Sequence, residues 1–202
     1  FKNTFATTLT SQVQVQNYQA KVRHYASAKD AALSENHIPD KVYDVLIDEV
    51  HRNLPLLHRY IKLRGEVLNL DKVHMYDLYT PIVKESNLSF TYPEAQAKAL
   101  EALQVYGDDY LQHVQEAFDN RWIDVVENKG KRTGAYSSGG YDTDPYILLN
   151  WQDGLEDLYT LVHEMGHSMH SYYTTHTQPY VYGDYPIFVA EIASTTNENL
   201  LT

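Results

Sequence analysis

The chain has 202 residues, of which 43% are hydrophobic, and a formal net charge of −11. The hydrophobic fraction suffices for a substantial core, whereas the negative charge and the lack of a large basic cluster argue against nucleic acid as a partner. The absence of cysteine excludes disulfides and thiolate metal sites. No apolar run approaches the roughly 18 residues that cross a bilayer and no signal peptide is visible, so we expect a cytoplasmic protein without a membrane partner.

The first 128 residues are predicted to be almost entirely helical. Apolar residues at helical spacing indicate one helix over residues 10–35 and a second that begins near Pro39 and ends near Leu68. Pro55 lies inside the second helix and is expected to kink or divide it. Shorter helical segments are predicted at residues 71–79, 92–103, 108–118 and 121–126. No linker rich in proline, glycine or serine separates domains, so we expect the whole chain to belong to one domain.

The composition changes after residue 128. Four glycines and two adjacent serines between Lys129 and Asp144 indicate a mobile loop or a tight hairpin. The apolar run from Tyr146 to Trp151 is the best strand candidate, and we expect it to be the edge of a small sheet that borders a cleft. Such an edge could bind an extended peptide through backbone hydrogen bonds. The spacing is equally compatible with an ordinary buried strand that follows a solvent-exposed loop.

A His-Glu-x-x-His motif lies in the next predicted helix, Leu155–Tyr173. His163 and His167 are four residues apart and share one helix face, where each can give one ring nitrogen to a single zinc ion. Glu164 follows the first histidine and can act as the general base toward a metal-bound water. The motif therefore predicts one zinc ion per chain and peptide-bond hydrolysis. On the motif alone, a helix that carries two histidines for packing stays an alternative.

A catalytic zinc site needs a third protein ligand. The downstream candidates are His170, His176, Asp184, Glu191 and Glu198. His170 lies about 10 Å along the helix from His163, so one ion cannot readily bind both together with His167. We expect His170 to support a ligand or to pack beside the site. A three-histidine site of the longer His-Glu-x-x-His type would need glycine at position 170 and histidine at 173, and this chain has neither.

Glu191 is the favoured third ligand. It lies in a predicted helix over residues 186–200, among apolar neighbours that indicate a buried face, where a carboxylate needs a partner such as a metal. Glu198 follows two turns later on the same face and could accept the spare N–H of a zinc-binding histidine. Two alternatives remain at this point. Glu191 could pair with a lysine or arginine, and Glu198 could lie at a solvated helix end beside Asn197 and Asn199.

The order and spacing of these residues resemble the M3 family of zinc metallopeptidases, and within it the oligoendopeptidase F branch. His163-Glu164-x-Gly166-His167-x-x-His170 is followed, 24 residues after His167, by Glu191 in Phe-Val-Ala-Glu-Ile-Ala-Ser. The resemblance extends over essentially the whole chain. Further similar segments are Asn53–Tyr60, Tyr76–Tyr79, Tyr136–Tyr141, Pro145–Trp151, Gln178–Asp184 and Ala193–Leu200.

The resemblance implies a mainly α, helical zincin-like metallopeptidase fold with a small β-sheet bordering a deep cleft for short, unfolded peptides. It implies zinc ligation by His163, His167 and Glu191. It also implies that Glu164 is the catalytic carboxylate and that the protein turns over peptides in the cytoplasm. The residues expected to line the substrate groove are Gly139, Gly140, Tyr146 and Leu148.

Members of this family are longer than 202 residues. The resemblance therefore implies that the chain is the central part of one catalytic domain, with a helical portion at residues 1–128 and the glycine loop, edge strand and zinc-site helices at 129–202. In the family, a later part supplies a histidine and tyrosines that hold the substrate carbonyl and the oxyanion, so the remainder of the same protein is an expected partner. Two alternatives to a zinc endopeptidase are a zinc-binding fragment that is inactive alone and a helical interaction domain with a coincidental motif.

Overall fold

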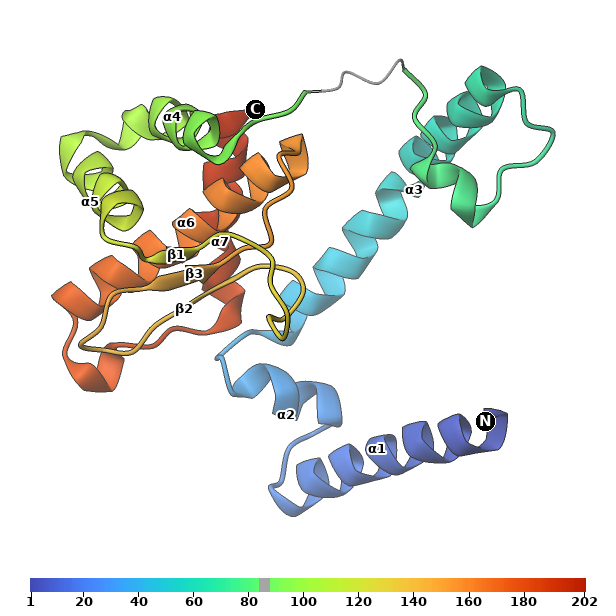
Figure 1. The fold of residues 1–202 in the computed structure, drawn as a ribbon. Helices are drawn as coiled ribbons and strands as arrows, with labels where there is room; N and C mark the ends of the chain where they lie inside the picture. The colour runs from blue at the N-terminus through green and yellow to red at the C-terminus, as the bar shows by residue number, and fades with distance from the viewer. Residues whose placement is uncertain (84–87) are drawn as a thin grey trace. The chain divides into compact units, whose positions relative to one another are not determined.

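The computed structural model of the chain describes residues 1–83 and 88–202 and divides into two compact units, Phe1–Glu85 and Ser86–Thr202 (Figure 1). Helices dominate both units. The boundary does not coincide with the expected division after residue 128, because α4 (Tyr92–Ala102) and α5 (Asp108–Asp119) pack on the helix that carries the motif. Membership of both units in one catalytic domain stays a prediction. Within the described ranges, no helix is both long and apolar enough to span a bilayer.

The described part of the first unit contains three α-helices and a short 3-10 helix. They are α1 (Lys2–Val22), α2 (Ala28–Ser34), α3 (Asp40–Leu68) and η1 (Met75–Tyr79). The single helix expected over residues 10–35 is wrong. The chain turns at His24, which has a φ of 63°, and Ser27 then caps α2 by accepting a hydrogen bond from the N–H of Asp30 at 3.0 Å. Pro55 does not divide α3, which continues through it.

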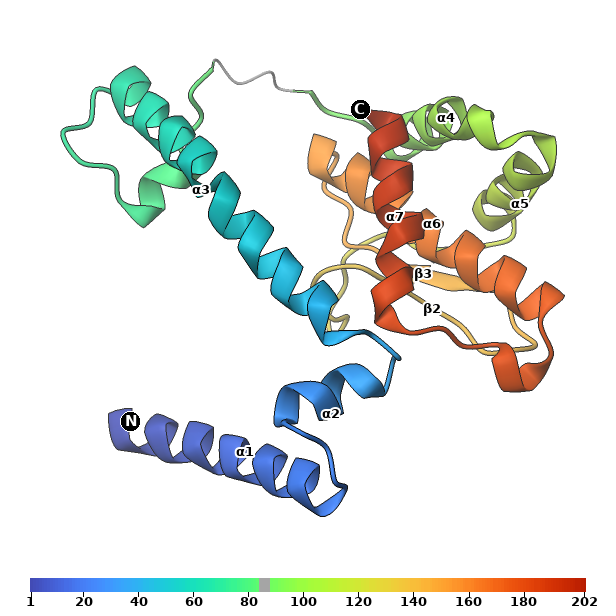
Figure 2. The same cartoon turned by 180° about the vertical axis from the view of Figure 1, so that it is seen from behind.

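In the second unit, α6 (Leu155–Thr177) lies between a small sheet and α7 (Ile187–Leu201), as Figures 1 and 2 show from opposite sides. The α6 helix begins where the Asp157 carboxylate accepts a hydrogen bond from the N–H of Gly154 at 2.8 Å. Its apolar side packs into the core of the unit. The largest fully buried apolar side chains of this core are Leu103, Val114, Ile147, Leu149, Leu161, Val162, Met165 and Met169.

The sheet has the strand order β1–β3–β2. Its strands are β1 (Ile123–Asp124), β2 (Tyr136–Ser138) and β3 (Tyr146–Leu148). The β3 strand pairs in parallel with β1 and antiparallel with β2. The edge position expected for residues 146–151 is therefore wrong, because β3 is central and β2 forms an edge. The helix expected at residues 121–126 is also wrong: Arg121 has a φ of 63°, which ends helical geometry, and Trp122 accepts a backbone hydrogen bond from Ile147 at 2.8 Å.

Candidate metal centre and active site

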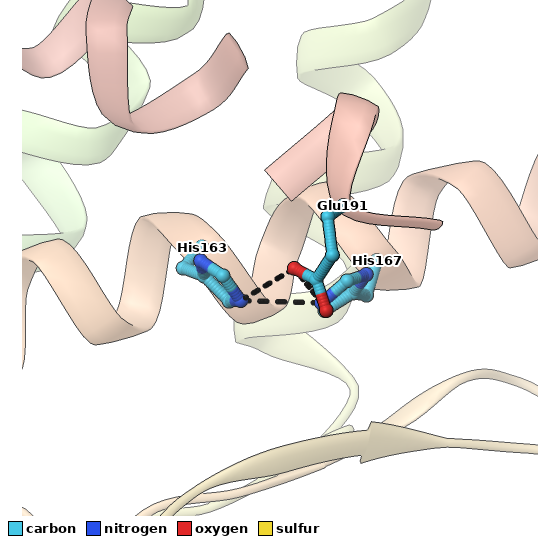
Figure 3. A group of neighbouring side chains, drawn as sticks. All are labelled: His163, His167 and Glu191. Atoms are coloured by element: carbon cyan, nitrogen blue, oxygen red, sulfur yellow. Dashed lines mark hydrogen bonds and ion pairs between the residues drawn. The ribbon is translucent and has the colours of Figure 1, made fainter. Parts of the chain in front are cut away.

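Side chains from two helices converge on one point. His163 and His167 project from α6, and Glu191 projects from α7 toward them (Figure 3). The Nε2 atoms of the two histidines are 3.2 Å apart, and each lies 3.5 Å from Oε2 of Glu191. In the parts of the chain that the structure describes, this is the group of His, Cys, Asp and Glu side chains that could hold a metal ion.

The surroundings of the two histidines indicate how their rings are protonated. Nδ1 of His163 lies 2.5 Å from Oε1 of Glu198. Because an ionised carboxylate only accepts hydrogen bonds, this contact places a hydrogen on Nδ1, which is the tautomer that leaves Nε2 for a metal. His167 makes a backbone hydrogen bond with Ala190. Burial lowers the pKa of His167, and His163 lowers it further, whereas Glu191 opposes this shift.

In the neutral tautomer with its hydrogen on Nδ1, each ring presents the lone pair of Nε2 toward the other. The carboxylate oxygen is an acceptor as well, although all three atoms lie within 3.5 Å of one another. Such atoms repel one another unless a cation lies between them. Imidazole nitrogen and carboxylate oxygen are common ligands of divalent metals, so the residues present fit a metal ion.

Gly166 explains how α7 comes close enough to deliver Glu191. A Cβ atom at position 166 would lie 2.7 Å from Cα and 2.9 Å from N of Ser194. Only glycine leaves room for this backbone contact. One turn of α7 after Ser194, the side chain of Asn197 is 1% exposed, and its Nδ2 donates to the carbonyl oxygen of Val162 in α6 at 3.2 Å. Both contacts hold α7 against α6 beside the ligand group.

The structure corrects two details about α7. We expected Glu191 beside a buried face, but its side chain is 51% exposed because it faces an open cavity. The solvated helix end proposed as an alternative for Glu198 is wrong, since the neighbouring Asn197 is buried and Glu198 contacts His163.

His170 lies outside the ligand group. Its ring stacks on that of Tyr185, with 3.7 Å between the centroids, and its buried Nδ1 has no hydrogen-bond partner among the residues that the structure describes. Burial lowers the pKa of His170, and His167 adds to the shift. His170 thus packs beside the ligand group and is not part of it. The other candidates, His176 and Asp184, are not members of the group either.

A cavity of about 1030 Å³ opens in front of the ligand group. Glu164 is 7% exposed and contributes to its wall. Burial raises the pKa of the Glu164 carboxyl, and the charge of Glu191 acts in the same direction, while His163 and a backbone hydrogen bond with Ser137 oppose the shift. A carboxyl with a raised pKa, placed beside a cation site, can accept and return a proton.

The edge strand β2 and the loop after it form one wall of the cavity. Gly139 and Gly140 line it as expected, but Tyr146 and Leu148 do not. The reason is the strand order, which places β3 behind β2, and Tyr146 instead lines a smaller cavity beside β1. The wall residue that sequence reasoning missed is Ser137, whose role depends on this strand order and has no local signal.

The register of β2 directs its backbone into the cavity. Ser137 lies opposite Ile147, and the N–H of Ile147 donates to Trp122 on the β1 side. The main-chain polar groups of Ser137 consequently point away from β3, which agrees with its backbone hydrogen bond to Glu164. Its hydroxyl lies 2.8 Å from that of Ser168, so a side-chain bond also ties β2 to α6.

A second wall comes from the segment between α6 and α7, which sequence reasoning did not assign to the site. The Tyr141 hydroxyl donates to the carbonyl oxygen of Gln178 at 2.6 Å, and its ring meets that of Tyr180 edge-on. Gly183 lies directly against the Tyr141 ring. Because these residues bring the glycine loop and the later segment together, the two loops form a continuous rim.

The chain is similar in sequence and in structure to bacterial oligopeptidases. The sequence model of peptidase family M3 matches residues 1–202. Oligopeptidase PepF of Bacillus subtilis is 58% identical over 201 residues, which cover 100% of this chain and 30% of that protein. Group B oligopeptidase PepB of Streptococcus agalactiae is 59% identical over 202 residues, covering 100% of this chain and 33% of that protein. The crystal structure of oligoendopeptidase-F from Enterococcus faecium matches with a TM-score of 0.62 and 43% identity, covering 100% of this chain and 28% of that one.

The chain thus spans about a third of the length of the curated relatives it matches. The expected mainly helical fold with a small sheet is confirmed.

Proposed function

The chain belongs to peptidase family M3, and we propose that it provides the metal centre of a zinc-dependent endopeptidase that hydrolyses short oligopeptides. The observation that carries the proposal is the convergence of three acceptor atoms, from His163, His167 and Glu191, at the wall of an open cavity.

The spacing of these atoms supports zinc as the metal. Zinc binds nitrogen and oxygen ligands at about 2.0–2.1 Å, so two ligands at the corners of a tetrahedron lie about 3.3–3.4 Å apart. The separations between the ligand atoms here are 3.2 Å and, twice, 3.5 Å. Two histidines and one glutamate are also a known ligand set of catalytic zinc sites. When bound, zinc supplies a Lewis acid that polarises the scissile carbonyl and lowers the pKa of water.

The remaining chemistry belongs to side chains of the chain itself. We assign to Glu164 the role of general base, which takes a proton from the attacking water and delivers it to the leaving amine. Its burial raises its pKa, which favours uptake of the proton from water. Glu198 and the backbone of Ala190 hold the rings of His163 and His167 in the orientation that ligation needs.

An extended peptide suits the wall formed by β2. The carbonyl oxygen of Ser137 points away from β3 and can accept a hydrogen bond from a peptide backbone that lies along β2. Gly139 and Gly140 carry no side chains, which leaves the adjoining wall open to substrate. Short peptides as substrates and a cytoplasmic location stay predictions.

The test is the substitution Glu164→Gln in the 202-residue chain. It should leave zinc content unchanged and abolish cleavage of a short internally quenched peptide. Glu156→Gln is the matched control, because Glu156 lies on the same helix, is exposed, and is distant in sequence from the ligands. Undiminished cleavage by the Glu164→Gln variant would refute the role of Glu164, and absence of bound zinc from the unchanged chain would refute the metal centre.

The share of the relatives that the chain covers favours a second candidate function. In this alternative, residues 1–202 hold zinc but cleave no peptide by themselves, since the chain spans about a third of its relatives. Mixing the chain with the remainder of the protein would then produce cleavage that neither part shows alone. Cleavage by the isolated chain at the same rate as by the mixture would exclude this alternative.

A further inference from the structure

We propose that Ser194 is a positioning residue for the Glu191 carboxylate and that the metal affinity of the site depends on its hydroxyl group. The proposal rests on the metal centre proposed above. Ser194 follows Glu191 by one turn of α7, and its Oγ donates a hydrogen bond to Oε2 of Glu191 at 2.9 Å. This bond joins a ligand to a residue that does not itself reach the ligand group.

The bond engages the oxygen that faces the histidines. Oε2 of Glu191 is the atom that lies 3.5 Å from Nε2 of both His163 and His167. A carboxylate oxygen has two lone-pair directions. When the Ser194 hydroxyl occupies one of them, the other stays available toward the two rings. The hydroxyl therefore selects the rotation of the carboxylate in which it can ligate a metal.

Glu191 depends on such support because of its exposure. Its side chain is 51% exposed, and among the described residues its ion-pair partners are the two histidines alone. A glutamate that no other group restrains would sample many rotamers in the cavity, and ordering it on metal binding would cost conformational entropy. A hydrogen bond that already holds the carboxylate reduces that cost, which raises the affinity.

Ser194 is well placed to act as a fixed donor. It is fully buried, and its backbone lies directly against Gly166 of α6. Its hydroxyl is also 3.2 Å from the backbone carbonyl oxygen of Glu191. The contact between the helices therefore fixes the position of the Ser194 hydroxyl. The hydrogen bond from this hydroxyl in turn fixes the position of the Glu191 carboxylate.

The experiment measures zinc affinity by competition with a chromogenic chelator. Ser194→Ala should lower the affinity about tenfold, the range reported for groups that orient metal ligands. Thr195→Ala is the matched control. The Thr195 hydroxyl bonds to the carbonyl oxygen of the same Glu191 but not to its carboxylate, so this variant should bind zinc like the unchanged chain.

A double-mutant cycle separates positioning from general damage to the fold. In a Glu191→Ala background, where no carboxylate remains to be oriented, Ser194→Ala should cause no further loss of zinc affinity. An equal loss in both backgrounds, or full affinity of the Ser194→Ala variant, would overturn the role of Ser194 while leaving the metal centre intact. If the unchanged chain bound no zinc, the metal centre and this proposal would fail together. Far-UV circular dichroism shows that each variant compared is folded.

Discussion

Replacement of Gly166 by alanine should push α7 away from α6 and weaken the metal site. The added Cβ would lie 2.7 Å from Cα of Ser194 and 2.8 Å from the carbonyl oxygen of Ala193. Both are backbone atoms, so no side chain can rotate away to relieve the overlap. Ordinary contact begins near 3.4 Å, which means that the backbone of α7 must retreat by about 0.7 Å at this point.

Two opposing effects determine the change in the free energy of unfolding. Alanine is favoured over glycine inside a helix by about 1 kcal/mol, while overpacking a well-packed contact costs about 1–3 kcal/mol. Because backbone is overlapped here, the cost should lie at the upper end, and we expect a net destabilisation of about 1–2 kcal/mol. A shift of 0.7 Å also exceeds the roughly 0.2 Å tolerance of metal–ligand distances. Zinc affinity should therefore fall at least about tenfold.

The two tryptophans make the stability of the second unit measurable. Trp122 and Trp151 both lie in it, so their fluorescence during urea unfolding follows this unit. Gly65→Ala is the matched control: Gly65 is also inside a helix, but its Cβ would meet only the end of the Val73 side chain, at 2.9 Å. The control should bind zinc normally. If the Gly166→Ala variant bound zinc with unchanged affinity and unfolded no earlier, the argument from close packing would be refuted.

Three further outcomes are expected. Glu198→Ala removes the partner of His163 and should lower zinc affinity about 10- to 100-fold in chelator competition, whereas Glu156→Ala should not. Zinc at 100 times its dissociation constant should raise the free energy of unfolding by about 2.7 kcal/mol, and a chelator should abolish the gain; identical urea midpoints with and without zinc would contradict this. Burial raises the pKa of the Tyr110 hydroxyl to about 12, although the hydrogen bond from Asn197 opposes the shift. The unfolded chain therefore loses the Tyr110 proton near pH 10, before the folded chain does. As a result, the free energy of unfolding falls as the pH rises from 10 to 12. In the Tyr110→Phe variant, the decrease in the free energy of unfolding over this pH range should be smaller by about 2–3 kcal/mol. Equally steep curves of unfolding free energy against pH for both proteins would refute the raised pKa of Tyr110.

Local periodicity explains why part of the site was predictable. The relation between His163 and His167 is set by helical geometry within a single segment, so the motif indicates their shared face without any knowledge of the fold. Glu191 and Glu198 were identified by the same periodicity on a second helix, together with the resemblance to a family. What these patterns do not contain is the distance between the two helices.

The errors around the sheet and the cavity share a physical cause. The strands β1 and β2 have two and three residues, too few to produce an alternation of apolar and polar side chains, and they exist because β3 pairs with both. The interior place of β3 in turn removes Tyr146 and Leu148 from the cavity. Ser137 and Ser194 were missed for the same reason, since a serine in a sequence gives no sign of the partner that its hydroxyl will meet.

The supporting contacts of the ligand group come from one helix, which links metal binding to helix packing. The α7 helix supplies Glu191 itself, the Ser194 bond to it, the Glu198 bond to His163 and, through Ala190, a backbone bond to His167. The Ser194 bond lies within α7, whereas the approach of Glu191 to the histidines and the contacts with His163 and His167 require α7 to lie on α6 at the distance that Gly166 permits. Because linked equilibria are reciprocal, a substitution that loosens the contact between these helices should lower metal affinity, and bound metal should hold the helices together by the same free energy. Zinc is therefore expected to stabilise the contact between Asn197 and Val162, which lies beside His163. Hydrogen exchange of the backbone amides there should slow when zinc is added.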